Sequence, residues 1–597
     1  MSGRIIRREL LRALVLGALL STSYMGVGAA ADYPITGDTI SGNHDLQEQY
    51  NLFNLDGNQK VTATSDVTVV SSGTEIENKA AIIDGRNNSG SSLDLNMDGH
   101  SLSIESYPYT FYMTSSNHKI DVHDADTISV KAIGRPIMYM PVGSGNEINL
   151  QANKDILLTQ VKDDFDSPSM SVKGDNTLSL KAGNDIVLHN DVKSNILTVS
   201  NKADLQIEAG HDVVFNRVSA EPYIPNLYVE RNANATVNAG NDIIFNRVKN
   251  ATPIGLRTNA TVNLKAKGNI IFHEEQASNP VAINMESDAD FQMEAQTISG
   301  NMQRMTMVAG GSNFNLKADD LQWGAPVGQS VEAVAPKNDP MLTSMISAGR
   351  SSTVKLDLGN SAKLANEITG TLLYTNFGSL TMNAGDSIYL HNTGYKSDDK
   401  FQSLIRLQGG TIDLTAGEGI LLDNKGAIAV LSEYYGEVNF NGKTAINGAG
   451  IGAFAPGGGI INFNGNTVMS QVGTGASASE SGTINFNGNT VMSQVDIGAL
   501  TETDSDPWAE ELTKINFEDD VVIDQAETGV SASYNSDIVF NKGLSIDAKD
   551  NAFYTESAGR IQALATGEDK VIKGNMQALN GQIDVLLDTE KSSFTGA

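Results

Sequence analysis

The sequence of 597 residues contains no cysteine, so no disulfide bond can hold this chain together. Proline is scarce, with 14 residues against 57 glycines, and aromatic residues make up only 6% of the chain. No long helical pattern stands out, and this composition suits many short strands joined by tight turns. The formal net charge of −30 argues against nucleic acid or an anionic membrane as a partner.

The N-terminus has the composition of a secretory signal peptide. Four arginines, at positions 4, 7, 8 and 12, precede an apolar run at 13–20 that is too short to span a bilayer, and alanines at 29–31 offer small residues for cleavage. We therefore predict a signal peptide over residues 1–31 and export through the Sec pathway. This segment carries four Arg and one Glu, so its removal changes the net charge from −30 to −33.

The lack of cysteine has a further meaning in an exported chain. Oxidising compartments permit disulfides, and exported domains often use them. One explanation is that the chain threads a narrow pore unfolded after it reaches the periplasm, where a disulfide-closed loop would jam. Chance absence is the alternative.

A repeat runs through the C-terminal half. The stretch "INFNGNTVMSQV" begins at Ile461 and again, letter for letter, at Ile484, a step of 23 residues. One longer interval of 31 residues contains "TETDSDPW" at 501–508. A fixed period with a local insertion is typical of a repeat architecture in which insertions become loops. Diverged copies begin at Val438, Ile515, Ile538 and Ile561.

An upstream series extends the repeat over nearly the whole mature chain. Units such as "TLSLKAGNDIVLHN" recur with steps of 30 and 27 residues and share one acidic position. Apolar residues alternate within each unit, and a third apolar segment precedes each pair of strands. Three short strands per unit, with Gly or Asn at the corners, predict a three-sided coil of parallel strands. The shared position is held by Asp155, Asp185, Asp212, Asp242 and Asn269.

This pattern also predicts domains and ladders. We expect β-helix over 32–321 with turns of 26–30 residues, an irregular loop insertion at 322–350, and β-helix over 351–597 ending in 23-residue turns. Equivalent residues should stack from turn to turn as an internal aromatic ladder and a hydrogen-bonded amide ladder. The aromatic members are Phe440, Phe463, Phe486, Phe517 and Phe540, and the amide members are Asn439, Asn462, Asn485 and Asn516.

The "AG-x-D-[IV]-x-[FL]-x-N" and "[VI]-N-F-N-G" units, the signal peptide and the lack of cysteine together resemble the passenger domains of autotransporters from double-membraned bacteria. The resemblance implies an all-β fold, a right-handed parallel β-helix (three-sided β-solenoid), here of roughly twenty turns. Family members carry a C-terminal outer-membrane barrel, which this chain lacks at its end. We therefore expect the full-length gene to continue into a barrel; export by another route is the alternative.

No catalytic, metal or cofactor residues are predicted. "GDSI" at 385–388 sits at a corner where other units carry "GND", so Ser387 is interpreted as part of a turn and not as a nucleophile. The acidic residues at 163–166 and 519–520 form no convincing acid and base pair. The histidines of one register are separated by Asn216 and Asn246, which favours a solvated face over a metal stripe. These histidines are His189, His273 and His391.

Candidate binding residues remain. Tyr112 and Tyr139 stand one turn apart, and internal stacking is favoured over an exposed sugar-binding strip. Trp323 and Trp508 accompany the two interruptions, either as caps on local hydrophobic patches or as binding hot spots. Arg217 and its equivalent Arg247 suggest an anion site, but stacked like charges favour side chains that splay into water.

We therefore expect an exported cell-surface β-helical passenger that is not an enzyme and acts as an adhesin or structural stalk. Its loops would bind a host-cell or bacterial surface protein or a glycan. The expected location is the cell surface or outer membrane, or the medium after secretion. The alternatives are a β-helix enzyme that degrades polysaccharide and a structural protein of a biofilm matrix or surface layer.

Overall fold

The structure is a computed structural model, and it describes most of the mature chain. The described residues are 33–46, 51–71, 81–86, 88–141, 145–161, 167–218, 224–247, 252–274, 281–324, 343–366, 371–392, 402–502 and 512–597. The predicted signal peptide at 1–31 lies outside them. Among the described residues, no helix has the length and hydropathy required to cross a membrane.

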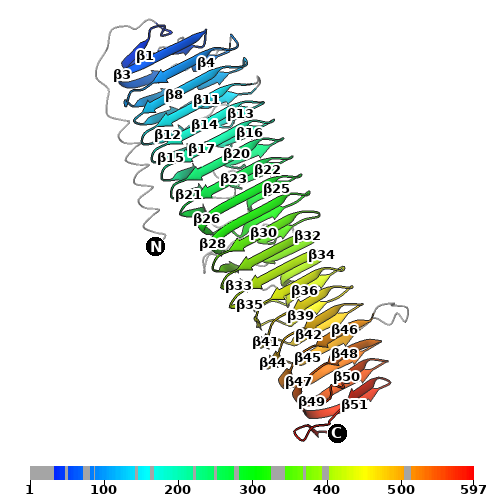
Figure 1. The fold of residues 1–597 in the computed structure, drawn as a ribbon. Coiled ribbons are helices and arrows are strands. Elements are labelled where there is room, and N and C mark those ends of the chain that lie inside the picture. Colours follow the sequence, from blue (N-terminus) through cyan, green and yellow to red (C-terminus); the bar gives the residue numbers. More distant parts are fainter. Residues whose placement is uncertain are drawn as a thin grey trace.

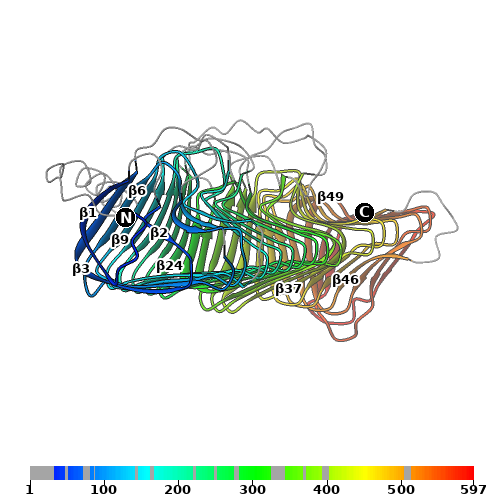
Figure 2. The same cartoon turned by 90° about the horizontal axis from the view of Figure 1, so that it is seen from above.

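The described strands form one continuous 53-stranded sheet wound into an elongated rod (Figure 1). Each strand pairs in parallel with its counterpart one turn before and one turn after, as β14 does with β11 and β17. Figure 2 shows successive turns following a similar outline along the rod. The prediction of an all-β, three-sided parallel β-solenoid is confirmed.

The pairings separate the strands into three faces, which we call A, B and C in the order in which each turn visits them. Face A contains β5 (Ser92–Asn96), β8 (Lys119–Ala125), β11 (Glu147–Ala152), β14 (Thr177–Ala182), β17 (Asp204–Ala209), β20 (Asn234–Ala239), β23 (Thr261–Ala266), β30 (Thr353–Leu358), β37 (Glu437–Asn441), β40 (Ile460–Phe463), β43 (Thr483–Phe486), β46 (Thr513–Phe517), β48 (Ser536–Phe540), β50 (Arg560–Ala563) and β52 (Gln582–Val585). Face B contains β6 (Leu102–Ser106), β9 (Ile128–Ala132), β12 (Ile156–Gln160), β15 (Ile186–Asn190), β18 (Val213–Arg217), β21 (Ile243–Arg247), β24 (Asn269–Glu274), β31 (Ala362–Asn366), β33 (Ser387–Asn392), β35 (Gly419–Asn424), β38 (Thr444–Asn447), β41 (Thr467–Ser470), β44 (Thr490–Ser493) and β53 (Ser593–Thr595).

Face C and the strands that bend across a corner complete the coil. Face C contains β2 (Phe53–Asn54), β4 (Ala81–Gly85), β7 (Tyr109–Met113), β10 (Met138–Met140), β13 (Met170–Lys173), β16 (Leu197–Ser200), β19 (Leu227–Glu230), β22 (Ile254–Arg257), β25 (Val281–Glu286), β27 (Arg304–Val308), β29 (Ile346–Ala348), β36 (Ile428–Glu433), β39 (Ile451–Ala455), β42 (Thr474–Ser479) and β45 (Ile497–Glu502). Two faces are shared by β1 (Thr39–Leu46), β3 (Asn58–Ser71), β26 (Asp290–Gly300), β28 (Asn313–Trp323), β32 (Leu373–Ala384), β34 (Ser403–Ala416), β47 (Val521–Ser533), β49 (Leu544–Glu556) and β51 (Lys570–Leu579).

Strict alternation along the strands builds the core. Leu178 and Leu180 of β14 and Ile186 and Leu188 of β15 are fully buried, and the residues between them face outward. Because each turn contributes such residues from all three faces, the core is one apolar column along the rod axis.

The two predicted ladders are confirmed. Adjacent rings of the five-phenylalanine series lie 4.9 Å apart between centroids and are nearly parallel. The amide groups of the asparagine series donate from Nδ2 to the Oδ1 of the preceding turn over 2.7–2.8 Å. The exact twelve-residue copy follows from this geometry, since each turn is the packing surface of an identical neighbour.

The corner between faces C and A uses left-handed backbone in most turns. Residues with φ between about +48° and +83° recur there, which glycine and asparagine tolerate best. Most turns place glycine or a polar residue at this corner, but four aromatic residues also occupy it. The series includes Asn201, Lys202, Arg231, Asn232, Thr258, Asn259, Ser287, Asp288, Gly310, Gly311, Ser351, Phe377, Gly409, Gly410, Tyr434, Tyr435, Gly457, Gly458, Glu480, Ser481, Tyr534, Asn535, Ser557 and Ala558.

The structure narrows the insertion that we expected at 322–350. Trp323 is the last residue of β28, and Ile346–Ala348 forms β29, which pairs with β27 and β32. The coil therefore continues into both ends of that range. Residues 325–342 lie outside the described residues.

Candidate functional site

A row of aspartates marks the corner between faces A and B. The Oδ1 atoms of Asp155, Asp185, Asp212 and Asp242 each accept the backbone N–H of the residue in the same position one turn later, over 2.7–3.1 Å. In three of these turns the side chain before the position also reaches back to the preceding aspartate, as Asn241 Nδ2 does when it donates to Asp212 Oδ1 over 2.7 Å. The aspartate of the repeated "AG-x-D" unit is thus a corner cap that joins consecutive turns.

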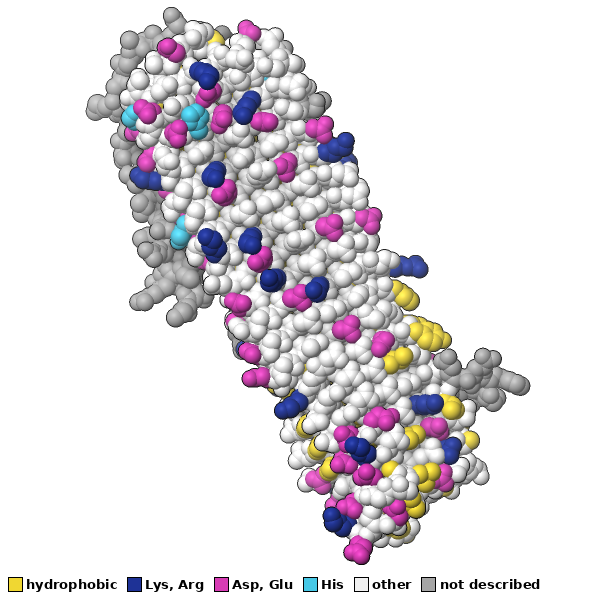
Figure 3. Space-filling model, viewed as in Figure 1, with side chains coloured by type: hydrophobic (Ala, Val, Ile, Leu, Met, Phe, Trp, Pro, Cys, Tyr) yellow, Lys and Arg dark blue, Asp and Glu magenta, His cyan; other side chains and the backbone are white. Residues whose placement is uncertain are grey.

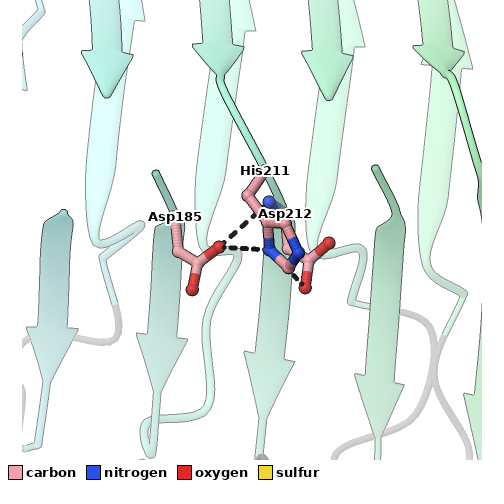
Figure 4. Close-up of side chains that lie close together, drawn as sticks. All are labelled: Asp185, His211 and Asp212. Carbon is pink, nitrogen blue, oxygen red and sulfur yellow. Dashed lines mark hydrogen bonds and ion pairs between the residues drawn. The ribbon is translucent and has the colours of Figure 1, made fainter. Parts of the chain in front are cut away.

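One member of this row has metal-binding residue types. Asp185, His211 and Asp212 offer ligand atoms within 4.8 Å of one another (Figure 4). His211 Nδ1 lies 2.9 Å from Asp185 Oδ1 and 3.2 Å from Asp212 Oδ2. His211 takes the place that Asn184 and Asn241 hold in neighbouring turns, where they make the same contact to the preceding aspartate. We therefore interpret the group as a variant of the repeated cap.

Removing one cap should loosen the corner. We expect Asp212→Ala to lower the free energy of unfolding by about 1–3 kcal/mol, because the N–H of Asp242 would stay buried without its acceptor. Asp212→Asn is the control, since its amide oxygen can still accept that hydrogen bond. Denaturation of the two variants measures the effect, and equal losses would contradict the capping role.

The histidines and the serine weighed for chemistry lie apart from one another. His189 bonds Asp191 over 2.7 Å and Asn216 over 2.9 Å, whereas His391 bonds Asp423 over 2.8 Å. His273 lies on β24, two turns beyond Asn216 in the same register. Ser387 Oγ lies 3.2 Å from Ser361 Oγ of the preceding turn. The contact of His189 with Asp191 lies within one turn and the others join adjacent turns, and among the described residues none of them brings a nucleophile, a base and an acid together.

The positions of Arg217 and Arg247 contradict our expectation that their side chains would splay into water. Arg217 and Arg247 are 1% and 3% exposed and lie in one register at the ends of β18 and β21, followed one turn later by Glu274, which is 1% exposed. They do not splay into water, because the alternation that points Val213 and Phe215 inward also points Arg217 inward. The hypothesis of an anion site here stays a prediction.

Arg217, Arg247 and Glu274 together form what we call the buried charge group, and burial governs its electrostatics. Arg217 Nη1 donates to the backbone carbonyl of Ile224. The three guanidinium nitrogens of Arg247 have no hydrogen-bond partner among the described residues. Burial, and then repulsion by Arg217, lowers the pKa of Arg247 to about 9, while Glu274 acts in the opposite direction. Two cations and one anion are therefore held in the interior of the rod.

Trp323 belongs to the core and not to a loop. Its indole is 3% exposed, lies over Gly300 of the preceding turn, and tilts against the ring of Phe272 at 5.4 Å. It ends an internal stack in which Phe245 lies 5.0 Å from Phe272. Of the two interpretations of Trp323, packing on a hydrophobic patch holds, and an exposed hot spot is wrong at this residue. Trp508 lies outside the described residues.

Tyr112 and Tyr139 project from the outer side of face C, so our expectation of internal stacking is wrong. Phe111 and Met113 of β7 point inward, and Tyr112 between them points outward by the same alternation. The rings of Tyr112 and Tyr139 lie 5.5 Å apart at 6°, and Tyr109 packs against both at 4.7 and 5.3 Å. The three side chains, which we call the tyrosine cluster, are half-buried on the surface.

Two arginines that the sequence analysis did not single out complete this surface. The guanidinium of Arg86 lies 5.4 Å from the centre of the Tyr112 ring, and that of Arg135 lies 5.6 Å from Tyr109. Arg86 is held by Asp84 through contacts of 2.8 and 2.9 Å from its Nε. Burial raises the pKa of Tyr109 and of Tyr112, so both phenols stay neutral hydrogen-bonding groups. Rings, hydroxyls and guanidiniums together suit recognition of a polar ligand with apolar patches.

Comparisons of the chain with protein-family models, with curated proteins and with solved structures found no match. The geometry of the described residues is therefore what bears on function. Within it, Tyr112 and Tyr139 are the sequence-predicted residues that the fold brings together at the surface, and Tyr109, which the sequence analysis did not single out, completes the cluster.

Proposed function

We infer that this chain is an exported β-helical surface protein that acts as an adhesin or stalk, in the manner of an autotransporter passenger. Its rod would carry binding side chains on its outer faces to a glycan or a protein on a host or bacterial surface. The observation that supports this best is the tyrosine cluster, since three aromatic side chains on the outside of a coil contribute little to its core.

Other features fit the same role. The coil has its contacts between neighbouring turns, so a long rod can hold a binding surface away from its attachment point. The strongly acidic composition keeps such a rod soluble and self-repelling. The signal peptide predicted at 1–31 would export it, and an outer-membrane barrel encoded with it would carry it to the cell surface.

Adhesion should depend on the tyrosine cluster. We expect the triple variant Tyr109→Ala, Tyr112→Ala, Tyr139→Ala to lower adhesion of coated beads to target cells at least tenfold, because it removes the outward rings and leaves Phe111 in the core. Tyr228→Ala is the matched control, as Tyr228 projects from the same face with its own partners Glu230 and Arg257. Circular dichroism checks the fold of each variant. Undiminished adhesion of a folded triple variant would contradict the proposed role of this surface.

A further inference from the structure

The corner between faces C and A carries aromatic residues where the backbone disfavours them. Phe377, Tyr434 and Tyr435 have φ of 53°, 51° and 59°. A bulky residue in this left-handed region is strained, and such strain concentrates at functional sites. The equivalent positions one turn on are glycines, Gly409 after Phe377 and Gly458 after Tyr435. The backbone itself therefore gives no reason for an aromatic side chain here.

These side chains also bury little. Phe377 is 56% exposed, Tyr434 59% and Tyr435 76%, so they rank among the most exposed large hydrophobic residues that the structure describes. Figure 3 shows hydrophobic side chains at several places on the C-terminal half of the rod, including its right-hand edge, while the same face of the N-terminal half shows almost none. Neither the core nor the corner explains them, which points to a ligand.

The rings lie as flat platforms. A Cβ atom placed on Gly409 would meet two carbons of the Phe377 ring at 2.6 Å and a third at 3.2 Å. Such distances put the glycine under the face of the ring and not at its edge. Tyr435 covers Gly458 in the same way, at 2.6, 2.7 and 3.3 Å. One face of each ring thus rests on the backbone of the next turn, and the exposure of the side chain leaves the other face to water.

A row of polar side chains flanks the platforms. Asn376, Gln408 and Glu433 pair in register on successive turns, each directly before the corner. Gln408 accepts a hydrogen bond of 2.7 Å from the hydroxyl of Tyr374, and Glu433 accepts one of 3.1 Å from Arg406 Nε. These contacts fix the row beside the rings, as a site with few but oriented polar groups requires.

The spacing of the platforms selects a ligand. Phe377 aligns with Gly409 of the next turn, and Gly409 aligns with the Tyr434–Tyr435 pair of the turn after that. The Phe377 platform and the Tyr435 platform are therefore two turns, or about 9.6 Å, apart. In an extended β-1,4-linked chain each sugar is rotated by half a turn from the last, and every second sugar presents the same face over a comparable length. The carboxylate of Glu433 and the net charge of −30 disfavour an acidic ligand.

We propose that the strip formed by Phe377, Tyr434 and Tyr435 binds a neutral, extended β-1,4-linked polysaccharide along the rod axis. Phe377 and Tyr435 stack on alternate sugars, and the polar row binds the hydroxyl groups between them. This inference rests on the proposed binding function and gives it a ligand class, at a site separate from the tyrosine cluster.

The test uses cellohexaose and chitohexaose in titration calorimetry with the whole mature chain. We expect the wild type to bind at least one of them and the double variant Phe377→Asn, Tyr435→Asn to bind at least tenfold more weakly. Asparagine tolerates left-handed backbone, so these variants should melt at or above the wild-type temperature. Tyr534→Asn is the matched control, because Tyr534 has φ of 50° at the equivalent corner and is 42% exposed.

The outcomes are distinct. If the wild type binds neither hexasaccharide, if the double variant binds as tightly as the wild type, or if Tyr534→Asn causes the same loss, the strip is not a polysaccharide site. Adhesion measured on the same proteins separates this from the wider proposal. Loss of adhesion in the tyrosine-cluster variant, with no hexasaccharide binding by the wild type, would overturn the strip alone and leave the adhesin function standing.

Discussion

Glu274→Gln is expected to destabilise the rod by about 3–5 kcal/mol, whereas Arg247→Met is expected to stabilise it by more than about 1 kcal/mol, because the lowered pKa of Arg247 marks a charge that the interior disfavours. Glu274 is the carboxylate that pairs in register with Arg247, and all three members of the buried charge group are at most 3% exposed. Loss of its charge would leave two buried guanidiniums beside each other. Loss of Arg247 removes a cation whose nitrogens find no partner among the described residues and ends the repulsion between two guanidiniums on adjacent turns.

The pH dependence gives this expectation a second check. The pKa of Arg247 is lowered to about 9 in the folded state, so the unfolded chain binds the proton more tightly. The destabilising contribution of Arg247 is therefore complete below pH 9 and shrinks as the pH rises above it. We expect the stability difference between wild type and Arg247→Met, measured by urea denaturation, to narrow from pH 8 to pH 10. A variant that is less stable than wild type at pH 8 would contradict the interpretation.

Phe463→Ala should cost about 3–5 kcal/mol of unfolding free energy in the C-terminal turns. The ring is fully buried and stacks at 4.9 Å on both Phe440 and Phe486, so its loss opens a cavity in the middle of the ladder. Val468→Ala is the control in the same turn, since Val468 is 44% exposed, and it should change stability by less than about 0.5 kcal/mol.

Thermal unfolding and hydrogen exchange over β40 and its neighbours measure the ladder effect. Faster exchange confined to adjacent turns is expected, because each turn is stabilised by the ones beside it. If the two variants behave alike, the aromatic ladder does not hold these turns together.

The coil itself could be predicted because its signal is repeated many times. The alternation is seen in pairs such as Leu178 and Leu180, and it recurs from turn to turn. The period is seen in the identical segments that begin at Ile461 and Ile484. A single ambiguous residue hardly weakens such a pattern. The asparagine and phenylalanine ladders follow from the period alone, since equal positions must meet in a parallel stack.

The sequence analysis predicted the direction of some side chains wrongly, because we gave the type of the residue more weight than its position in the strand. Arg217 shares the inward parity of Phe215, and Tyr112 lies between the inward Phe111 and Met113, so alternation contained both answers. We instead expected charge to seek water and clustered aromatics to seek the core. Trp323 continues the inward register of Leu321 on β28, in agreement with the interpretation of this residue as packing on a hydrophobic patch. The left-handed aromatics had a weaker signal, since only alignment of Tyr435 with Gly458 reveals the corner that they share.

The neighbour-only pairing of the strands has a mechanical consequence. Hydrogen bonds between turns run along the rod axis, so a pull at its two ends loads them directly, and the strand pairings of the described residues pass the force only from each turn to the next. The rod can therefore yield by unspooling single turns from one end while the remaining turns stay wound. A tether built in this way lengthens stepwise under load and dissipates work at each released turn, which is a useful property in a filament that holds two moving surfaces together.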